Sequence, residues 1–353
     1  MGSQEAAERL ASFFVSIGCD KVYDINLARH LALVESYREL KRRFESKSEL
    51  PIISSICPGW TCYAEKTNGH LIVPHLSRVR SPQQIMGALL KREHQRRDGL
   101  SRGDIFHLTL MPCFDKKLEA SRSDFKSPID GSQDVDCVLT PLELEEILGS
   151  EGVTLQDFER RKLDILTETG EEFDFPLSSH FGSVSGGYAE NLLLAAVSET
   201  SGKNCDSKQS DIGYSTLRNG DFIELSIKSS GEIASKRPKF AIVNGFRNIQ
   251  TIVQRLKRKA LGYDYIEIMA CPSGCINGGA QCRASEPGHR DSLVESVKKL
   301  YQEVEPVKLG IKQTDDLLRL YKVLNLETDD CREKILYTDF HPVPKMQNLT
   351  VSW

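Results

Sequence analysis

Three short apolar runs, each ending in a turn that carries a cysteine, constrain the fold of this chain most strongly. The runs and their turns are Ile52 to Ile56 before Cys57, Ile105 to Leu110 before Cys113, and Tyr265 to Met269 before Cys271. Apolar runs of this length, bounded by turn residues, are typical of buried strands. Helical patterns separate them, so we expect an α/β fold with mainly parallel strands, whose functional groups gather at the carboxyl ends of the strands.

Helix signals mark the intervening segments. Ser81 and Thr140 each begin a capping box with a proline at the first helical position. Further helices are predicted over about 6–17, 28–44, 188–197 and 248–259. The polar segment 199–236 is the best candidate for a variable surface insertion, with a hairpin formed by 221–227 and 232–235.

The length of 353 residues suggests two lobes that share a cleft. We expect residues 1–50 to form an N-terminal helical part of the core, 51–180 a first lobe and 181–340 a second lobe. Residues 341–353 then form a C-terminal tail.

Composition narrows the class of protein. The chain is 39% hydrophobic and 27% charged, as soluble globular proteins are, and no apolar stretch approaches the roughly 18 residues of a membrane span. The net charge of −4, with both signs interspersed, gives no broad basic surface for nucleic acid. The basic run Lys91–Arg97 is interpreted as a solvated helix face. The start of the chain lacks the features of a secretory signal, which makes the cytosol or nucleus the default compartment.

The ten cysteines are too sparse for a disulfide scaffold, so their clustering matters more than their number. Cys271 and Cys275 lie four residues apart among residues that allow tight turns, and Cys57 and Cys113 add two further thiols at strand ends. Four thiolates suit a 4Fe–4S cluster and also a tetrahedral zinc site. The other six are interpreted as ordinary packing residues: Cys19, Cys62, Cys137, Cys205, Cys282 and Cys331. Spare ligands or redox-active neighbours are the alternative for Cys62 and Cys282, which lie near the four in sequence. No zinc-finger spacing, P-loop or Rossmann fingerprint occurs.

Three segments together resemble the signature motifs of iron-only hydrogenases. They are Ser54-Ser55-Ile56-Cys57-Pro58-Gly59-Trp60, Met111-Pro112-Cys113-Phe114-Asp115-Lys116-Lys117-Leu118-Glu119 and Glu267-Ile268-Met269-Ala270-Cys271-Pro272-Ser273-Gly274-Cys275-Ile276-Asn277-Gly278-Gly279-Ala280-Gln281. The match is closest to the eukaryotic branch without hydrogenase activity, the Nar-type cytosolic iron–sulfur assembly factors, also called nuclear prelamin A recognition factor-like proteins.

The resemblance implies that Cys57, Cys113, Cys271 and Cys275 hold one 4Fe–4S cluster buried between the two lobes. In true hydrogenases a second cysteine precedes the first ligand and relays protons, whereas this chain has Ile56, which carries no transferable proton. We therefore expect no enzyme activity and no catalytic residue. The lysine that matches Lys116 helps to hold a di-iron group in hydrogenases.

The resemblance also implies partners. Members of the assembly-factor branch usually carry an N-terminal segment with four cysteines for a second cluster, which this sequence is expected to lack. Val351-Ser352-Trp353 is similar to tails read by the cytosolic targeting complex, which includes a WD40-repeat subunit. The expected function is that of an adaptor that receives clusters from an early scaffold and helps to deliver them to cytosolic and nuclear apoproteins. A prelamin-binding nuclear protein with a structural cluster and a residual hydrogenase-like redox enzyme are the alternatives.

Overall fold

The computed structural model describes residues 1–46, 50–167, 177–183, 186–200, 211–217, 219–228, 238–283, 289–305, 307, 311 and 315–344. Its larger sheet has the strand order β1-β7-β6-β5-β4. The strands are β1 Ile52–Ile53, β4 Ile212–Thr216, β5 Phe222–Ile227, β6 Phe240–Asn244 and β7 Tyr265–Met269. The pairs β1–β7 and β6–β7 are parallel, whereas β5 pairs antiparallel with both β4 and β6. A second sheet pairs β2 Leu108–Leu110 with β3 Cys137–Leu139 in parallel.

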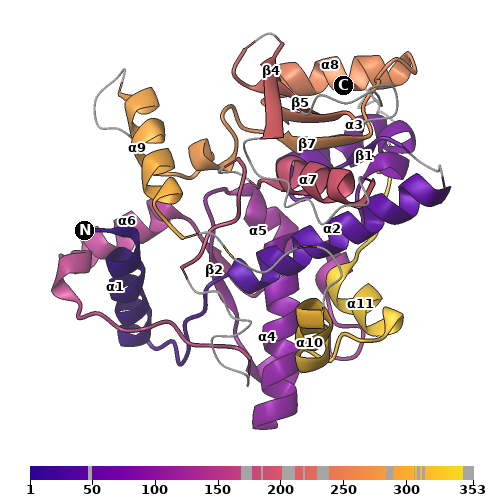
Figure 1. The fold of residues 1–353 in the computed structure, drawn as a ribbon. Coiled ribbons are helices and arrows are strands. Elements are labelled where there is room, and N and C mark those ends of the chain that lie inside the picture. The colour runs from indigo at the N-terminus through magenta and orange to yellow at the C-terminus, as the bar shows by residue number, and fades with distance from the viewer. Residues whose placement is uncertain are drawn as a thin grey trace, which may run out of the picture.

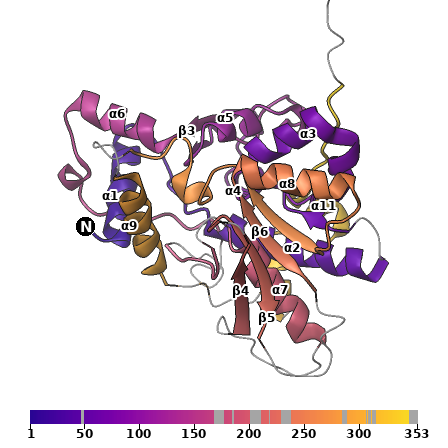
Figure 2. The same ribbon diagram turned by 90° about the horizontal axis from the view of Figure 1, so that it is seen from above.

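Helices cover both faces of the larger sheet (Figures 1 and 2). Side chains of β6 point alternately to the two faces of the sheet. Phe240 and Ile242 pack in the core on the side of α2 and α7. Ala241 and Val243 pack in the core on the side of α3 and α8. The helices are α1 Ser3–Ser16, α2 Asn26–Ser46, α3 Pro58–Ile72, α4 Pro82–Asp98, α5 Asp115–Ala120, α6 Pro141–Glu151, α7 Tyr188–Thr200, α8 Phe246–Lys257, α9 Arg290–Gln302, α10 Asp315–Val323 and α11 Asp329–Leu336. None of these described helices has the length and apolar character needed to cross a lipid bilayer.

The predicted α/β class with mainly parallel strands is confirmed. Strands β2 and β7 end at the predicted residues, whereas β1 ends at Ile53, three residues before the predicted end at Ile56. The capping box at Thr140 forms, with its hydroxyl accepting from the Glu143 N–H and the Glu143 side chain accepting from the Thr140 N–H. The predicted box at Ser81 does not form, because the Ser81 hydroxyl donates instead to Glu119 Oε2 at 2.9 Å. The helix still begins there, since Pro82 favours the first helical position.

Two expectations about segments need adjustment. Strand β5 lies at the predicted position, but its hairpin partner is β4, which precedes it, within a segment expected to be irregular. The other predicted hairpin strand, 232–235, lies outside the described residues. Strand β1 belongs to the expected first lobe, 51–180, yet it pairs with β7 of the expected second lobe, 181–340, so the larger sheet takes strands from both expected lobes.

Candidate metal centre

The four cysteines singled out by the sequence line one cavity of about 410 Å³, measured out to its mouth. Cys57 follows β1 and directly precedes α3, Cys113 follows β2, and Cys271 follows β7. Cys275 begins a short 3-10 turn at Cys275–Asn277. Thus strand ends from both sheets bring together thiols that are up to 218 positions apart in the chain.

Glycines allow the three cysteine-bearing loops to approach one another. A Cβ atom on Gly278 would lie 2.2 Å from the carbonyl oxygen of Pro112, so only glycine fits between the loops of Cys275 and Cys113. A Cβ atom on Gly59 would lie 2.6 Å from Asp115 Oδ2. Gly274 has a φ of +77°, a conformation that glycine adopts without strain. The tight turns predicted around Cys271 and Cys275 therefore have a direct packing function.

Backbone N–H groups and one lysine surround the thiols. The N–H of Ala270 donates to Cys57 Sγ and that of Asp115 donates to Cys113 Sγ, each at 3.3 Å. Lys116 also lines the cavity, and its Nζ donates to the carbonyl oxygen of Ile56 at 3.1 Å. These groups favour a negatively charged ligand in the cavity.

Burial disfavours the thiolate form of Cys57, Cys113 and Cys275. It raises the pKa of Cys57 and of Cys275, and raises that of Cys113 to about 12. A metal group bound here would therefore displace protons from the thiols, and its binding would depend on pH.

The donor set fits an iron–sulfur cluster better than a single ion. In the described part of the chain, no three His, Cys, Asp or Glu side chains lie close enough together to hold one metal ion. The four thiols nevertheless line the same cavity, which suits a group larger than an ion and bound by thiolates at its corners. A cluster held by these residues would supply electron-transfer chemistry, while the chain itself supplies the ligands, the N–H donors and the nearby ammonium group.

The remaining described cysteines lie outside the cavity lining. Cys19, Cys62, Cys137 and Cys331 are half-buried and Cys282 is exposed. Cys62 lines a different, smaller pocket with Arg80, Ser81 and Glu119. Cys205 and the predicted partner-binding residues Val351, Ser352 and Trp353 lie outside the described residues.

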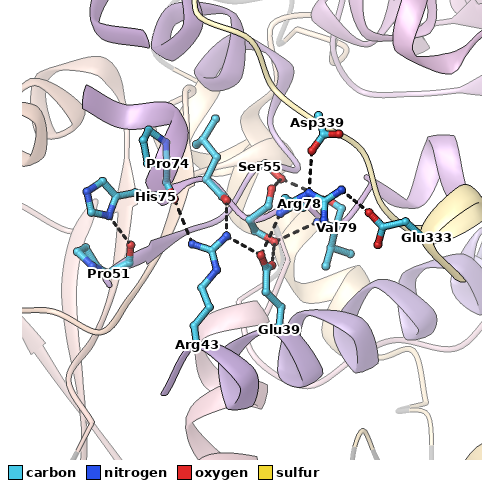
Figure 3. Close-up of polar contacts among 12 residues, drawn as sticks. Glu39, Arg43, Pro51, Ser55, Pro74, His75, Arg78, Val79, Glu333 and Asp339 are labelled. Atoms are coloured by element: carbon cyan, nitrogen blue, oxygen red, sulfur yellow. Dashed lines mark hydrogen bonds and ion pairs between the residues drawn. The ribbon is translucent and has the colours of Figure 1, made fainter. Parts of the chain in front are cut away.

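A buried ion pair of α2 contacts the segments on either side of Cys57, and Figure 3 shows its polar contacts. Arg43 Nη2 of α2 donates to Glu39 Oε1 at 2.6 Å and to the Leu76 carbonyl oxygen at 2.8 Å. Glu39 Oε2 accepts from the Ser77 hydroxyl at 2.5 Å, and the Ser55 hydroxyl donates to the Ser77 carbonyl oxygen at 2.6 Å. Since Ser55 is two residues before Cys57, this network connects α2 to the first cysteine loop.

A second ion pair joins the helices that follow Cys57 and Cys113. Arg122 lies just after α5 and donates from both terminal nitrogens to the Glu65 carboxylate of α3, each at 2.8 Å. Glu65 also accepts from the His341 N–H at 3.0 Å, and the Arg122 guanidinium lies over the Phe340 ring. We call residues 337–343 the C-terminal strap, because through these contacts it is held against both cysteine-bearing segments.

Sequence reasoning missed these supporting residues, and it missed Met269 and Asp115 as lining residues of the cavity. The four-residue spacing of Glu39 and Arg43 was an unused signal of a helical ion pair, and it carries no sign of their contacts with residues 76–78. Met269 had a detectable signal, since it ends the strand directly before Ala270 and Cys271. Its sulfur accepts from Cys275 Sγ at 3.6 Å.

The fold and the cavity define a class: α/β proteins that place several thiols at the carboxyl ends of their strands to hold a metal group. Residues 1–279 match the family described as "Iron only hydrogenase large subunit, C-terminal domain", and the chain belongs to this family. Known structures agree on the fold. The structure superposes on the apo [FeFe]-hydrogenase HydA1 variant C377H from Chlamydomonas reinhardtii with a TM-score of 0.79 at 23% identity, covering 96% of this chain and 89% of that one.

Within the family, similar sequences carry assembly-factor names. A probable cytosolic Fe-S cluster assembly factor of Drosophila virilis is 42% identical over 100% of this chain and 73% of its own length. Cytosolic iron-sulfur assembly component 3 of Pongo abelii is 42% identical, and a cytosolic Fe-S cluster assembly factor of Xenopus tropicalis is 39% identical, each over 99% of this chain and 72% of the relative. The resemblance inferred from the three motifs is confirmed.

Proposed function

We propose that this chain acts in cytosolic iron–sulfur protein assembly as an adaptor without enzyme activity, and that Cys57, Cys113, Cys271 and Cys275 hold one 4Fe–4S cluster. The observation that carries the proposal is the single cavity lined by these four thiols. The names of relatives at 39–42% identity support the pathway and a cytosolic location.

Metal analysis tests the ligand set. Protein reconstituted under anaerobic conditions should contain about four irons and four acid-labile sulfides per chain. Cys271→Ala and Cys275→Ala should each lose most of this iron and the absorbance of the cluster. Cys282→Ala is the matched control, because Cys282 is exposed and does not line the cavity. One zinc per chain without labile sulfide, or unchanged iron in the Cys275 variant, would disprove the assignment.

Ile56 supports a role without hydrogenase activity. It lines the cavity next to Cys57, and its side chain has no proton to transfer. A hydrogen-evolution assay with a reduced dye should give no turnover above that of the Cys275→Ala variant. Clear turnover by the unaltered chain would make the redox-enzyme alternative correct.

The partner is part of the same proposal. The cytosolic targeting complex, with its WD40-repeat subunit, would read Val351, Ser352 and Trp353, and an early scaffold would supply the cluster. Purified targeting complex should retain the full chain and lose it when the last three residues are removed. Retention of a farnesylated lamin tail instead, independent of those residues, would favour the prelamin-binding alternative.

A further inference from the structure

Helix α8 presents an exposed row of positive charges, and the helix itself contains no acidic residue that could neutralise them. Residues 246–263 contain five Lys or Arg and no Asp or Glu. Of these five, Arg247, Lys257, Arg258 and Lys259 are exposed, and among the described residues none of the four forms an ion pair. At 100° per residue, Arg247, Gln254 and Arg258 lie along one line on the side opposite the buried Ile249 and Val253.

The other basic run of the chain behaves differently. In α4, Arg92 and Arg96 pair with Glu93, and Arg97 pairs with Asp98. The run that is most basic in sequence is therefore largely neutralised in the fold. The row on α8 is not, although the whole chain carries a net charge of −4.

Helix stability does not explain all of these cations. Lys257, Arg258 and Lys259 lie at the carboxyl end of α8, where positive charge interacts favourably with the helix dipole. Arg247 is in the first turn, where the same dipole disfavours a cation, and no acidic residue in that turn compensates for it. A positive charge kept at an unfavourable position is better explained by a ligand than by folding.

The amino end of α8 lies at the rim of the candidate metal centre. Gly245, directly before the helix, donates its N–H to the Met269 carbonyl oxygen at 2.9 Å and packs near Pro272. Phe246 is 42% exposed and meets the Tyr63 ring of α3 edge-on, with ring centroids 5.4 Å apart. Figure 2 shows α8 beside α3 on one face of the sheet. The basic row therefore begins next to an aromatic pair and the Cys271 loop.

We propose that the exposed side of α8, from Phe246 to Lys259, binds an acidic segment of a protein partner, with an aromatic or apolar residue of that segment against Phe246 and Tyr63. The positive row is one helix wide and about 18 Å long by the rise of an α-helix, which matches one acidic segment rather than a nucleic acid. Gln250 and Gln254 add uncharged hydrogen-bonding groups beside the cations. A partner bound there covers the rim of the Cys271 loop.

A binding assay with the full chain tests this surface. The probe is a labelled, Glu-rich helical peptide that matches the 12 residues of α8 and carries one terminal Trp, measured by fluorescence anisotropy at low and physiological salt. Arg247→Gln, Lys257→Gln and Arg258→Gln combined should weaken binding roughly tenfold, as expected for three lost exposed pairs. The matched control removes three exposed lysines elsewhere, Lys126→Gln, Lys162→Gln and Lys322→Gln, and should leave the affinity unchanged.

Two further measurements test whether the peptide binds at α8 and whether its Trp contributes to the affinity. The unaltered chain should gain hydrogen-exchange protection over α8 and 271–277 when the peptide binds, and should lose affinity when the peptide Trp is replaced by Ala. Equal weakening by both triple variants, or tighter binding of a single-stranded RNA or of phosphatidylserine vesicles than of the peptide, would overturn the proposal. The assay requires no iron, so a negative result would leave the cluster assignment intact. Likewise, metal analysis that disproved the cluster assignment would not decide whether α8 binds an acidic segment.

Discussion

Loss of the Arg43 guanidinium should destabilise the chain far more than loss of its neighbour on the same helix. Arg43 and Glu39 are 6% and 1% exposed at their side chains, so Arg43→Met leaves a carboxylate buried without its cation. Breaking a buried pair in this way costs about 3–5 kcal/mol of unfolding free energy. Arg42→Met is the control, because Arg42 is exposed, and should change stability by less than about 0.5 kcal/mol.

Urea unfolding of the iron-free chain, followed by tryptophan fluorescence, measures this difference, since Trp60 is fully buried beside the Cys57 loop. Combining Arg43→Met with Glu39→Gln should recover about 1–2 kcal/mol relative to Arg43→Met alone, because the amide removes the buried charge and still accepts from Ser77. Equal midpoints for the Arg43 and Arg42 variants, or no recovery in the double variant, would refute this reasoning.

Three further changes give separate tests. Gly278→Ala places a Cβ atom against the Pro112 carbonyl oxygen and should cost about 1–3 kcal/mol and most of the bound iron, whereas Gly279→Ala, which meets no atom within 4 Å, should change neither iron content nor melting temperature. Burial lowers the pKa of His107 to about 4, below its value of about 6.5 in an unfolded chain, so its contribution to stability is present above pH 6.5 and is lost as the pH falls. Between pH 7 and 5 the unaltered chain should lose about 2 kcal/mol more unfolding free energy than His107→Gln does, because the buried His30 and His180 contribute to the pH dependence of both; an equal loss in the variant would contradict the assignment. Glu65→Gln weakens the paired hydrogen bonds to its arginine partner and should cost about 2 kcal/mol, with faster hydrogen exchange over the C-terminal strap; unchanged exchange there would show that the strap does not depend on this carboxylate.

The convergence of the four cysteines on one cavity could be predicted because its signals are local. In each of three segments a strand leads through a short turn to a cysteine, and the ends of parallel strands from both sheets meet at the cavity. The capping box at Thr140 was predicted for the same reason, since all its atoms belong to residues 140–143. The resemblance of the motifs favoured a 4Fe–4S cluster over a zinc ion, a choice that the residues alone left open.

Contacts between distant segments were not predictable in this way. Ser81 lies at the position of a capping residue, but its hydroxyl donates a hydrogen bond to Glu119, 38 positions later. The pairing of β1 with β7 joins residues more than 200 positions apart, and two residues of strand carry too little pattern to specify it. The unpaired charge of α8 was equally hidden, because whether a basic run is neutralised depends on which acids the fold places beside it.

The arrangement of the proposed ligands bears on what a cluster in this cavity can do. Three separate loops contribute thiols, and Cys57 is only 8% exposed. Gly278 and Gly59 let neighbouring loops pack in close contact, so separating the loops would break these contacts. A group bound to such loops stabilises the folded chain by its binding free energy, and its release requires the loops to open. On the proposed ligand set, this cluster is therefore a resident part of the structure rather than the cargo that is transferred.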